Sequence, residues 1–232
     1  MAYRHLFFDL DHTLWDFDAN SRLTLQELHA HFELEQRGIH DFDLFHKNYL
    51  VHNDKLWERY RKGFIKVDEL RWKRMWLTLL DFKVGDEKLA RDMAVRFLDL
   101  LPSRTLLFPH AIELLTYLSD KNYHLHLITN GFESVQHLKL QHAGIDHFFI
   151  EVITSEGSNS MKPNKEIFEY AFQKARALPG ESIMIGDNLE VDIQGGINAG
   201  IDQVHVNHIK TPTGPIKATY TVYSLEELKN LF

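Results

Sequence analysis

Short apolar segments alternate with helical patterns through the second half of the chain, and this alternation restricts the fold more than any other feature. The segments with strand character are residues 5–8, 124–129, 148–154, 182–186 and 203–207, with a weaker one at 219–223. Between them, side chains such as Ile167, Phe168 and Ala171 recur at helical spacing. Strand–helix–strand units of this length form right-handed crossovers between parallel strands. The sequence therefore predicts an α/β fold class with a Rossmann-like, mostly parallel sheet core.

Residues 17–100 have a different pattern, in which no strand is evident. Apolar and aromatic side chains recur there at helical spacing, as at Phe42, Phe45 and Tyr49. We expect four helices in this stretch, which form a cap inserted directly after the first strand. The predicted domains are a Rossmann-like core over residues 1–16 and 101–232 and a helical cap over residues 17–100.

The composition excludes several classes of protein. A net charge of −7 disfavours a general nucleic-acid binder. The chain has no cysteine, which excludes disulfides and thiolate zinc sites, and its 15 histidines are scattered without an HExxH pattern. The sequence has neither a secretory signal nor an apolar run of about 18 residues. We expect a cytoplasmic monomer or homodimer with no nucleic-acid or membrane partner.

Polar residues follow four of the predicted strands, and most of them carry acidic, hydroxyl or amino groups. In chain order they are Asp9, Asp11 and Thr13 after the first strand, Thr129, Asn130 and Gly131 at the end of the second, Lys162 after the third, and Asp187 and Asp192 after the fourth. Ligands of an open parallel sheet bind beyond the carboxyl ends of the strands, where the strand order reverses. These residues are therefore expected to converge on one site.

The residue types in this set indicate a magnesium and phosphate site. Carboxylates crowded together are unfavourable unless a cation lies between them. Oxygen ligands without cysteine favour Mg²⁺ over zinc, and Mg²⁺ usually shares substrate phosphate oxygens. Thr129 and the backbone N–H groups of Asn130 and Gly131 can bind the remaining phosphate oxygens. Such an arrangement is typical of phosphoryl transfer.

Taken singly, these residues also have ordinary structural explanations. An acid after a buried strand, such as Asp9, is often a helix cap, and Asp192 can be an acid favoured by the start of a helix. Lys162 can be a solvated loop lysine. The convergence of four strand ends on one site is what favours the functional interpretation.

The same residues form motifs that resemble the haloacid dehalogenase-like hydrolase superfamily. The motifs are "DLDHT" at residues 9–13, the threonine of "TNG", the lysine of "MKP" and "GDNLEVD" at residues 186–192. Within the superfamily, "TNGF", "KPNKEIF", "DIQGGINAG" and "LWDFDAN" are similar to the capped pyrimidine 5′-nucleotidases. One loop departs from that branch, because "EGSNSMK" is more polar than the expected "EEVGVAK" type.

The resemblance implies a role for each matching residue. Asp9 would be the nucleophile that forms an aspartyl-phosphate, and Asp11 would protonate the leaving oxygen and later activate water. Because dehalogenases as a rule lack this second acid, the presence of Asp11 sets that branch aside.

The resemblance also implies the ligands of the metal and of the phosphoryl group. Mg²⁺ would be held by Asp9, Asp187 and the backbone carbonyl of Asp11, with Asp192 beside it. Thr129 and Lys162 would bind the phosphoryl group, and Lys162 would also orient the nucleophile.

The choice of substrate is expected to depend on aromatic and basic residues near and within the cap. All four tryptophans lie in the first third of the chain, and residues 55–74 contain eight Lys or Arg against three Asp or Glu. This composition suits an anionic substrate with a flat ring, although aromatic residues also fill small helical cores. Trp15 and Phe17, at the hinge between strand and cap, are the predicted substrate-contacting pair.

Three functions stay open at the level of sequence. The first is a Mg²⁺-dependent 5′-nucleotidase with pyrimidine preference, whose partner is a nucleoside monophosphate. The second is a phosphatase for small sugar phosphates or phosphoglycolate. The third is a non-enzymatic binding protein of the same fold, which the intact set of acids disfavours.

Overall fold

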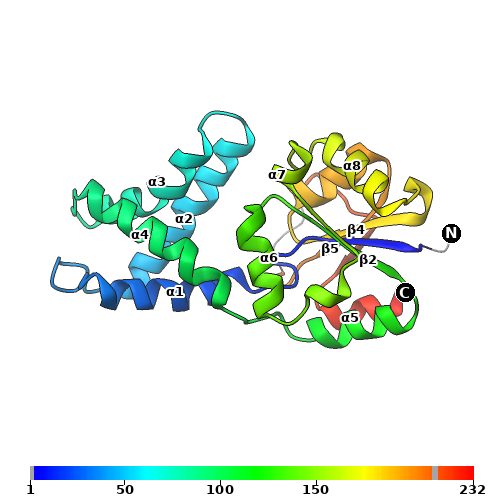
Figure 1. Cartoon of the computed structure of the whole chain (residues 1–232), viewed down its shortest axis with the longest axis horizontal. Coiled ribbons are helices and arrows are strands. Elements are labelled where there is room, and N and C mark those ends of the chain that lie inside the picture. The colour runs from blue at the N-terminus through cyan, green and yellow to red at the C-terminus, as the bar shows by residue number, and fades with distance from the viewer. Residues whose placement is uncertain (1–2, 211–213) are drawn as a thin grey trace. The chain divides into compact units, whose positions relative to one another are not determined.

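The computed structural model describes residues 3–210 and 214–232, and the chain divides into two compact units (Figure 1). The α/β unit comprises Met1–Phe17 and Thr105–Phe232, and the helical unit comprises Asp18–Arg104. The first segment of the α/β unit thus ends at residue 17, where the sequence predicted an end at residue 16. The helical unit ends at residue 104, where the sequence predicted an end at residue 100.

A six-stranded parallel sheet forms the centre of the α/β unit. Its strands are β1 (His5–Phe8), β2 (His124–Thr129), β3 (Glu151–Thr154), β4 (Ser182–Gly186), β5 (Asp202–Val206) and β6 (Tyr220–Val222). Their order is β3-β2-β1-β4-β5-β6, and every neighbouring pair is parallel. The predicted α/β class with a mostly parallel sheet is confirmed. The third strand begins later than predicted, because residues 146–148 form a helical turn.

Helices cover both faces of this sheet (Figure 1). The main ones are α5 (Ala111–Asp120), α6 (Glu133–His142), α7 (Ser155–Ser158), α8 (Lys165–Ala175) and α9 (Gln194–Ala199). The inner face of α8 places Ile167 and Phe168 against Phe7, Ile128 and Met184 of three strands. Each of these side chains is fully buried, which typically stabilises a fold by about 1.5–3 kcal/mol per side chain. Strands β1 and β4 are buried along their whole length, which explains why their sequences, HLFF and SIMIG, are mostly apolar runs.

The apolar pattern does not indicate α6, and the structure gives the reason. Its buried residues are Gln136, Lys139 and Leu140, so two of the three inward side chains are polar. A helix with a polar inner face has little hydrophobic periodicity to detect. The buried polar groups of α6 contact the residues that follow β1 and β2, as described below.

The helical unit consists of four long helices. They are α1 (Phe17–His31), α2 (Phe42–Arg61), α3 (Val67–Asp81) and α4 (Glu87–Leu100). Asp41 and Asp86 start α2 and α4, because their carboxylates accept hydrogen bonds from the N–H groups of Leu44 and Leu89 at 2.9 and 3.0 Å. Tyr49 packs against Phe97 in the interior, with ring centroids 5.3 Å apart.

The three tryptophans of the helical unit lie outside its buried core. Trp57, Trp72 and Trp76 are half-buried. The rings of Trp72 and Trp76 are 6.1 Å apart, and the guanidinium of Arg91 lies 4.0 Å from the centre of the Trp72 ring. Trp72 therefore holds a cation of its own unit.

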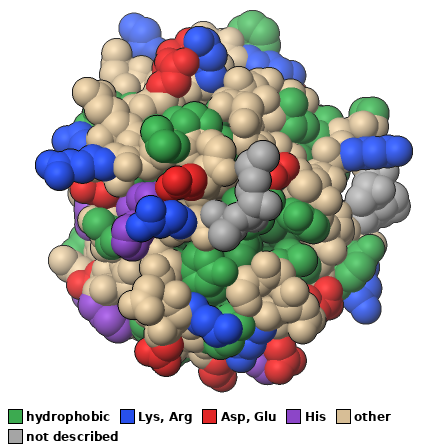
Figure 2. All heavy atoms as spheres, turned by 90° about the vertical axis from the view of Figure 1, so that its right-hand side faces the viewer, with side chains coloured by type: hydrophobic (Ala, Val, Ile, Leu, Met, Phe, Trp, Pro, Cys, Tyr) green, Lys and Arg blue, Asp and Glu red, His purple; other side chains and the backbone are tan. Residues whose placement is uncertain are grey.

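The charge of the surface and the apolarity of the helices are relevant to two classes of partner, nucleic acids and membranes. Figure 2 shows one face of the molecule, on which acidic and basic side chains are interspersed with apolar ones. The described side chains on that face do not form a single-sign patch of the kind that attracts a polyanion. Within the described residues, no helix combines the length and apolarity that crossing a bilayer requires.

Candidate active site

The fold brings the ends of three strands together at one edge of the sheet. Strand β1 pairs with β2 on one side and with β4 on the other, so Asp9, Thr129 and Asp187 come from adjacent strand ends. The chain adds β2 and β3 on one side of β1 and then β4 to β6 on the other. The strand order therefore reverses beside β1, where parallel sheets bind their ligands.

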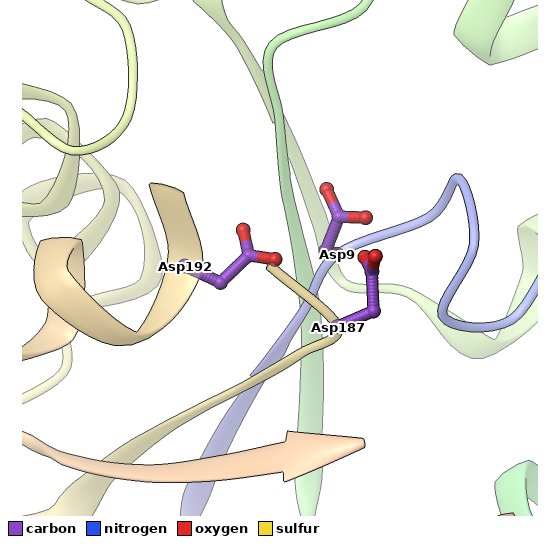
Figure 3. A group of neighbouring side chains, drawn as sticks. All are labelled: Asp9, Asp187 and Asp192. Atoms are coloured by element: carbon purple, nitrogen blue, oxygen red, sulfur yellow. The ribbon is translucent and has the colours of Figure 1, made fainter. Parts of the chain in front are cut away.

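Three carboxylates lie close together at this point. Oxygen atoms of Asp9, Asp187 and Asp192 are all within 4.8 Å of one another, and Figure 3 shows the side chains entering one space from three segments. Burial raises the pKa of Asp9 to about 8, with Lys162 opposing the rise and the charges of Asp192 and Asp187 adding to it. Burial and the charge of Asp192 likewise raise the pKa of Asp187 to about 8, against the opposing effects of Lys162 and Thr13.

This group of carboxylates fits a magnesium ion. All three donors are hard oxygen atoms, which Mg²⁺ prefers, and burial together with the neighbouring acids raises the pKa of Asp9 and of Asp187 despite the charge of Lys162. A divalent cation at this position would favour the ionised carboxylates. Three of the acids predicted near the metal, Asp9, Asp187 and Asp192, thus lie close enough together for one ion to contact them.

Lys162 occupies the inner side of the cluster, where its ammonium donates two hydrogen bonds and forms an ion pair with Asp192. Its Nζ donates to Asp9 Oδ1 at 2.6 Å and to the carbonyl of Ile128 at 2.7 Å, and lies 2.7 Å from Asp192 Oδ1. Burial alone would lower the pKa of this lysine, but Asp192 and Asp9 outweigh burial and raise it. Lys162 is 1% exposed and charged, so it is a fixed cation beside Asp9 and not a solvated loop residue.

Asn130 fixes the backbone of Lys162. The side-chain Oδ1 of Asn130 accepts from the N–H of Lys162 at 2.8 Å, and its Nδ2 donates to the carbonyl of Lys162 at 2.9 Å. This two-point contact joins the loop after β2 to the loop after β3. The side chain of Asn130 thus holds the lysine, while binding of phosphate by its backbone N–H stays a prediction.

The hydroxyl of Thr129 is oriented by two donors. It accepts hydrogen bonds from the N–H of Gly131 at 3.1 Å and from Nε2 of Gln136 at 2.6 Å. Because a hydroxyl has two acceptor positions and one hydrogen, its hydrogen remains available for a further acceptor such as a phosphate oxygen. The N–H of Gly131, predicted to bind phosphate, is directed to Thr129. A Cβ on Gly131 would lie 2.3 Å from Nε2 of Gln136, which explains the glycine.

Asp11 lies outside the group of three carboxylates. Its Oδ1 accepts from Lys139 Nζ at 2.6 Å and its Oδ2 accepts from Gln136 Nε2 at 2.9 Å. The carboxylate of Asp11 is therefore directed away from the other three acids. Contact of a metal with the backbone carbonyl of Asp11 stays a prediction. Lys139 and Gln136 are not among the residues predicted from the sequence. In the sequence they are marked only by their spacing: two long polar side chains three residues apart lie on the same face of a helix. The structure shows that this face of α6 is buried.

Trp15 and Phe17 do not form the open stacking surface expected from the sequence. Trp15 is fully buried and Phe17 is 7% exposed. The ammonium of Lys139 lies 4.2 Å from the centre of the Trp15 ring and 5.7 Å from that of Phe17. The aromatic pair therefore surrounds a lysine of its own unit, and this arrangement corrects the expectation that the pair presents a face to a nucleotide base.

Two histidines, His205 within β5 and His208 just after it, hold the loops in place. Nε2 of His208 lies 3.0 Å from the carbonyl of Thr13, and Nε2 of His205 lies 2.9 Å from the carbonyl of Asp187. Burial lowers the pKa of both rings, which keeps them neutral at pH 7. The hydroxyl of Thr13 lies 3.5 Å from Asp9 Oδ2 and 3.2 Å from Asp187 Oδ1, so it links the two strand ends. Nothing in the sequence distinguishes His205 and His208 from the other histidines, so their contacts with the backbone carbonyls could not be predicted.

Comparison with known proteins identifies the family of this chain. A sequence-family profile described as haloacid dehalogenase-like hydrolase matches residues 3–200. The pyrimidine 5′-nucleotidase PynA of Streptococcus pneumoniae is 34% identical over 98% of this chain and 94% of its own length. The pyrimidine 5′-nucleotidase YjjG of Escherichia coli is also 34% identical, over 100% of this chain and 98% of its own.

The fold of this chain is also similar to that of a solved structure. The HAD-hydrolase YfnB of Bacillus subtilis, crystallised bound to magnesium, has a TM-score of 0.89 and 28% identity, and the match covers 100% of this chain and 99% of that protein. The resemblance seen in the four motifs is thereby confirmed. The chain belongs to the haloacid dehalogenase-like hydrolase family.

Proposed function

We propose that this protein is a Mg²⁺-dependent phosphomonoesterase that hydrolyses 5′-nucleoside monophosphates, with a preference for pyrimidines. One observation carries the proposal: a buried carboxylate, Asp9, held by a charged lysine and lying beside two further acids at the switch point of the sheet. The expected partner is a small phosphorylated metabolite in the cytoplasm.

The first step is transfer of the phosphoryl group to Asp9. Lys162 holds Oδ1 at 2.6 Å, and an oxygen of this carboxylate attacks phosphorus. The bond between phosphorus and the 5′ oxygen breaks, and its electron pair stays on that oxygen. The carboxyl group of Asp11 donates its proton to the leaving oxygen, so the nucleoside departs as an alcohol.

The second step is hydrolysis of the aspartyl-phosphate. Asp11, now a carboxylate, takes a proton from water as the water oxygen bonds to phosphorus. The bond between phosphorus and the Asp9 oxygen breaks, which regenerates the Asp9 carboxylate and releases inorganic phosphate. Asp11 ends the cycle protonated, ready for the next substrate.

Other residues hold the phosphoryl group and the metal. Thr129 offers its hydroxyl hydrogen and Lys162 its charge to the phosphoryl oxygens. Asp9, Asp187 and Asp192 would hold Mg²⁺, with the carbonyl of Asp11 as a further ligand. When bound, the ion neutralises charge on the carboxylates and on the phosphoryl oxygens.

The pyrimidine preference is the finer part of the proposal. A site that binds only the phosphoryl group treats all monophosphates alike, so base preference needs further contacts, each worth about 1–3 kcal/mol in an apolar pocket. Support comes from PynA and YjjG, which are both named pyrimidine 5′-nucleotidases and match this chain over nearly its full length.

A phosphate-release panel tests the proposal. The wild-type protein is assayed with UMP, dUMP, dTMP, purine monophosphates, sugar phosphates and phosphoglycolate, with Mg²⁺ and with EDTA. Asp9→Asn protein prepared in parallel controls for a contaminating phosphatase. We expect Mg²⁺-dependent release with the highest kcat/KM for pyrimidine nucleotides. A sugar phosphate or phosphoglycolate that exceeds every nucleotide by about tenfold would contradict the nucleotidase assignment.

A further inference from the structure

Helix α6 connects the loop after β1 to the end of β2 through two buried polar side chains. Gln136 and Lys139 are three residues apart and so lie on the same helix face. They are 0% and 2% exposed, although glutamine and lysine are rarely buried without a specific partner. Their shared partner is the carboxylate of Asp11, which receives one hydrogen bond from each.

The surroundings of Lys139 hold its ammonium in one place. Asp11 Oδ1 lies 2.6 Å from Nζ, and the rings of Trp15 and Phe17 face the same atom with centroids at 4.2 and 5.7 Å. Aromatic faces attract a cation without adding a competing carboxylate. The acid of the loop and the aromatic residues that follow it thus form one binding site for a single ammonium group.

Gln136 connects the same acid to the phosphate side of the site. Its Nε2 carries two hydrogens, and it lies 2.9 Å from Asp11 Oδ2 and 2.6 Å from Thr129 Oγ1. The amide therefore fixes the separation between Asp11 and the hydroxyl that is proposed to bind phosphate.

We propose that Lys139, supported by Gln136, is a positioning residue that fixes the Asp11 carboxyl group in the orientation needed for proton transfer, an inference that rests on the proposed function. Each carboxylate oxygen has two lone-pair positions, so an oxygen bonded to Lys139 or Gln136 can still exchange a proton with substrate. The side chain of Asp11 is 26% exposed, which leaves it reachable while its rotation is restricted.

Loss of the lysine is expected to release Asp11 into other orientations. A carboxylate with this exposure can rotate and bind water when one of its two donors is removed. A misplacement of about 1 Å in a reacting group can cost about 10²-fold in rate. The loss should appear where proton donation matters, which is in the departure of a poorly stabilised alkoxide and not of nitrophenolate.

Leaving-group dependence in Lys139→Met tests this inference. The parameter kcat/KM reports steps up to departure of the leaving group, so it isolates the first proton transfer. For UMP we expect kcat/KM to fall about 10²-fold, and for p-nitrophenyl phosphate to fall much less. Lys174→Met is the matched control, because Lys174 is an exposed lysine over the Tyr170 ring, and it should leave both values unchanged.

A second comparison separates positioning from general damage to the fold. In an Asp11→Asn background, Lys139→Met should cause little further loss, because the group it positions is already removed. If Lys139→Met does not fold, Lys139→Gln keeps a polar donor at the site, and the same difference between the two substrates is expected.

Three outcomes would overturn the inference. Equal losses of kcat/KM for both substrates would mean that Lys139 has only a structural role. Unchanged kinetics in Lys139→Met, with a clear loss in Asp11→Asn, would mean that Asp11 needs no positioning. A wild-type protein that hydrolyses neither substrate would refute the proposed function itself, and the inference with it.

Discussion

Acidification is expected to destabilise the α/β unit through His126, whose ring is buried within the sheet. His126 lies in β2 and is 1% exposed, with ring centroids 4.8 Å from Phe7 and 5.3 Å from His5. Its Nε2 lies 3.1 Å from Nδ1 of His5, and its own Nδ1 has no hydrogen-bond partner among the described residues. Burial, with the charges of His5 and His124 adding, lowers the pKa of His126 to about 3.

The sign and size of the effect follow from this difference in pKa. The ordinary pKa is 6.5, so between pH 6.5 and about pH 3 the unfolded chain binds a proton that the folded chain does not. The neutral ring therefore contributes its full stability above pH 6.5, and this contribution is lost as the pH falls toward 3. Between pH 7 and pH 5 the loss in the free energy of unfolding is at most about 2 kcal/mol.

Urea denaturation followed by circular dichroism at pH 7 and pH 5 measures this loss. In His126→Phe, which keeps a ring but cannot take up a proton, the decrease between the two pH values should be smaller than in wild type by up to about 2 kcal/mol. His147→Gln removes an exposed histidine of the same unit and should keep the wild-type decrease. A His126→Phe protein that loses as much stability as wild type would refute the reasoning.

Three further predictions concern the site. Asp9→Asn should lower kcat by about 10⁵-fold or more while the circular dichroism spectrum is retained, because an amide cannot attack phosphorus; substantial turnover would exclude Asp9 as nucleophile. Asp187→Asn should raise the Mg²⁺ concentration that gives half-maximal activity more than it raises KM, since it removes a carboxylate of the cluster; a magnesium titration shows whether it does. Gly131→Ala should cost about 1–3 kcal/mol in urea denaturation, because its Cβ displaces the amide of Gln136; unchanged stability would contradict the close contact.

The inner strands of the sheet could be predicted from the sequence because they are short, largely apolar segments that are buried on both faces. His5–Phe8, His124–Thr129 and Ser182–Gly186 have the predicted bounds. The polar residues after these strands were also predictable, since parallel strands direct their carboxyl ends to one edge.

The contacts between these residues could not be predicted in the same way. Hydrogen bonds of Gln136 and Lys139 to Asp11 depend on the packing of α6, a helix without a hydrophobic stripe. Trp15 is an error of the opposite kind, because the sequence predicted an open ring face that the structure does not have. Its position after the nucleophile motif indicated a substrate contact, but sequence position does not reveal that a lysine about 120 residues later covers the ring.

The covalent step at Asp9 is the central claim, and trapping the aspartyl-phosphate tests it most directly. Asp11→Asn protein is mixed with p-nitrophenyl phosphate and Mg²⁺, quenched with acid, reduced with borohydride and mapped by peptide mass spectrometry. Nitrophenolate leaves without a proton, while hydrolysis of the intermediate lacks its base, so the intermediate should accumulate. We predict a reduced aspartyl group at Asp9 and none in the Asp9→Asn, Asp11→Asn double variant. Turnover without any such modification, or modification of a different residue, would contradict the mechanism.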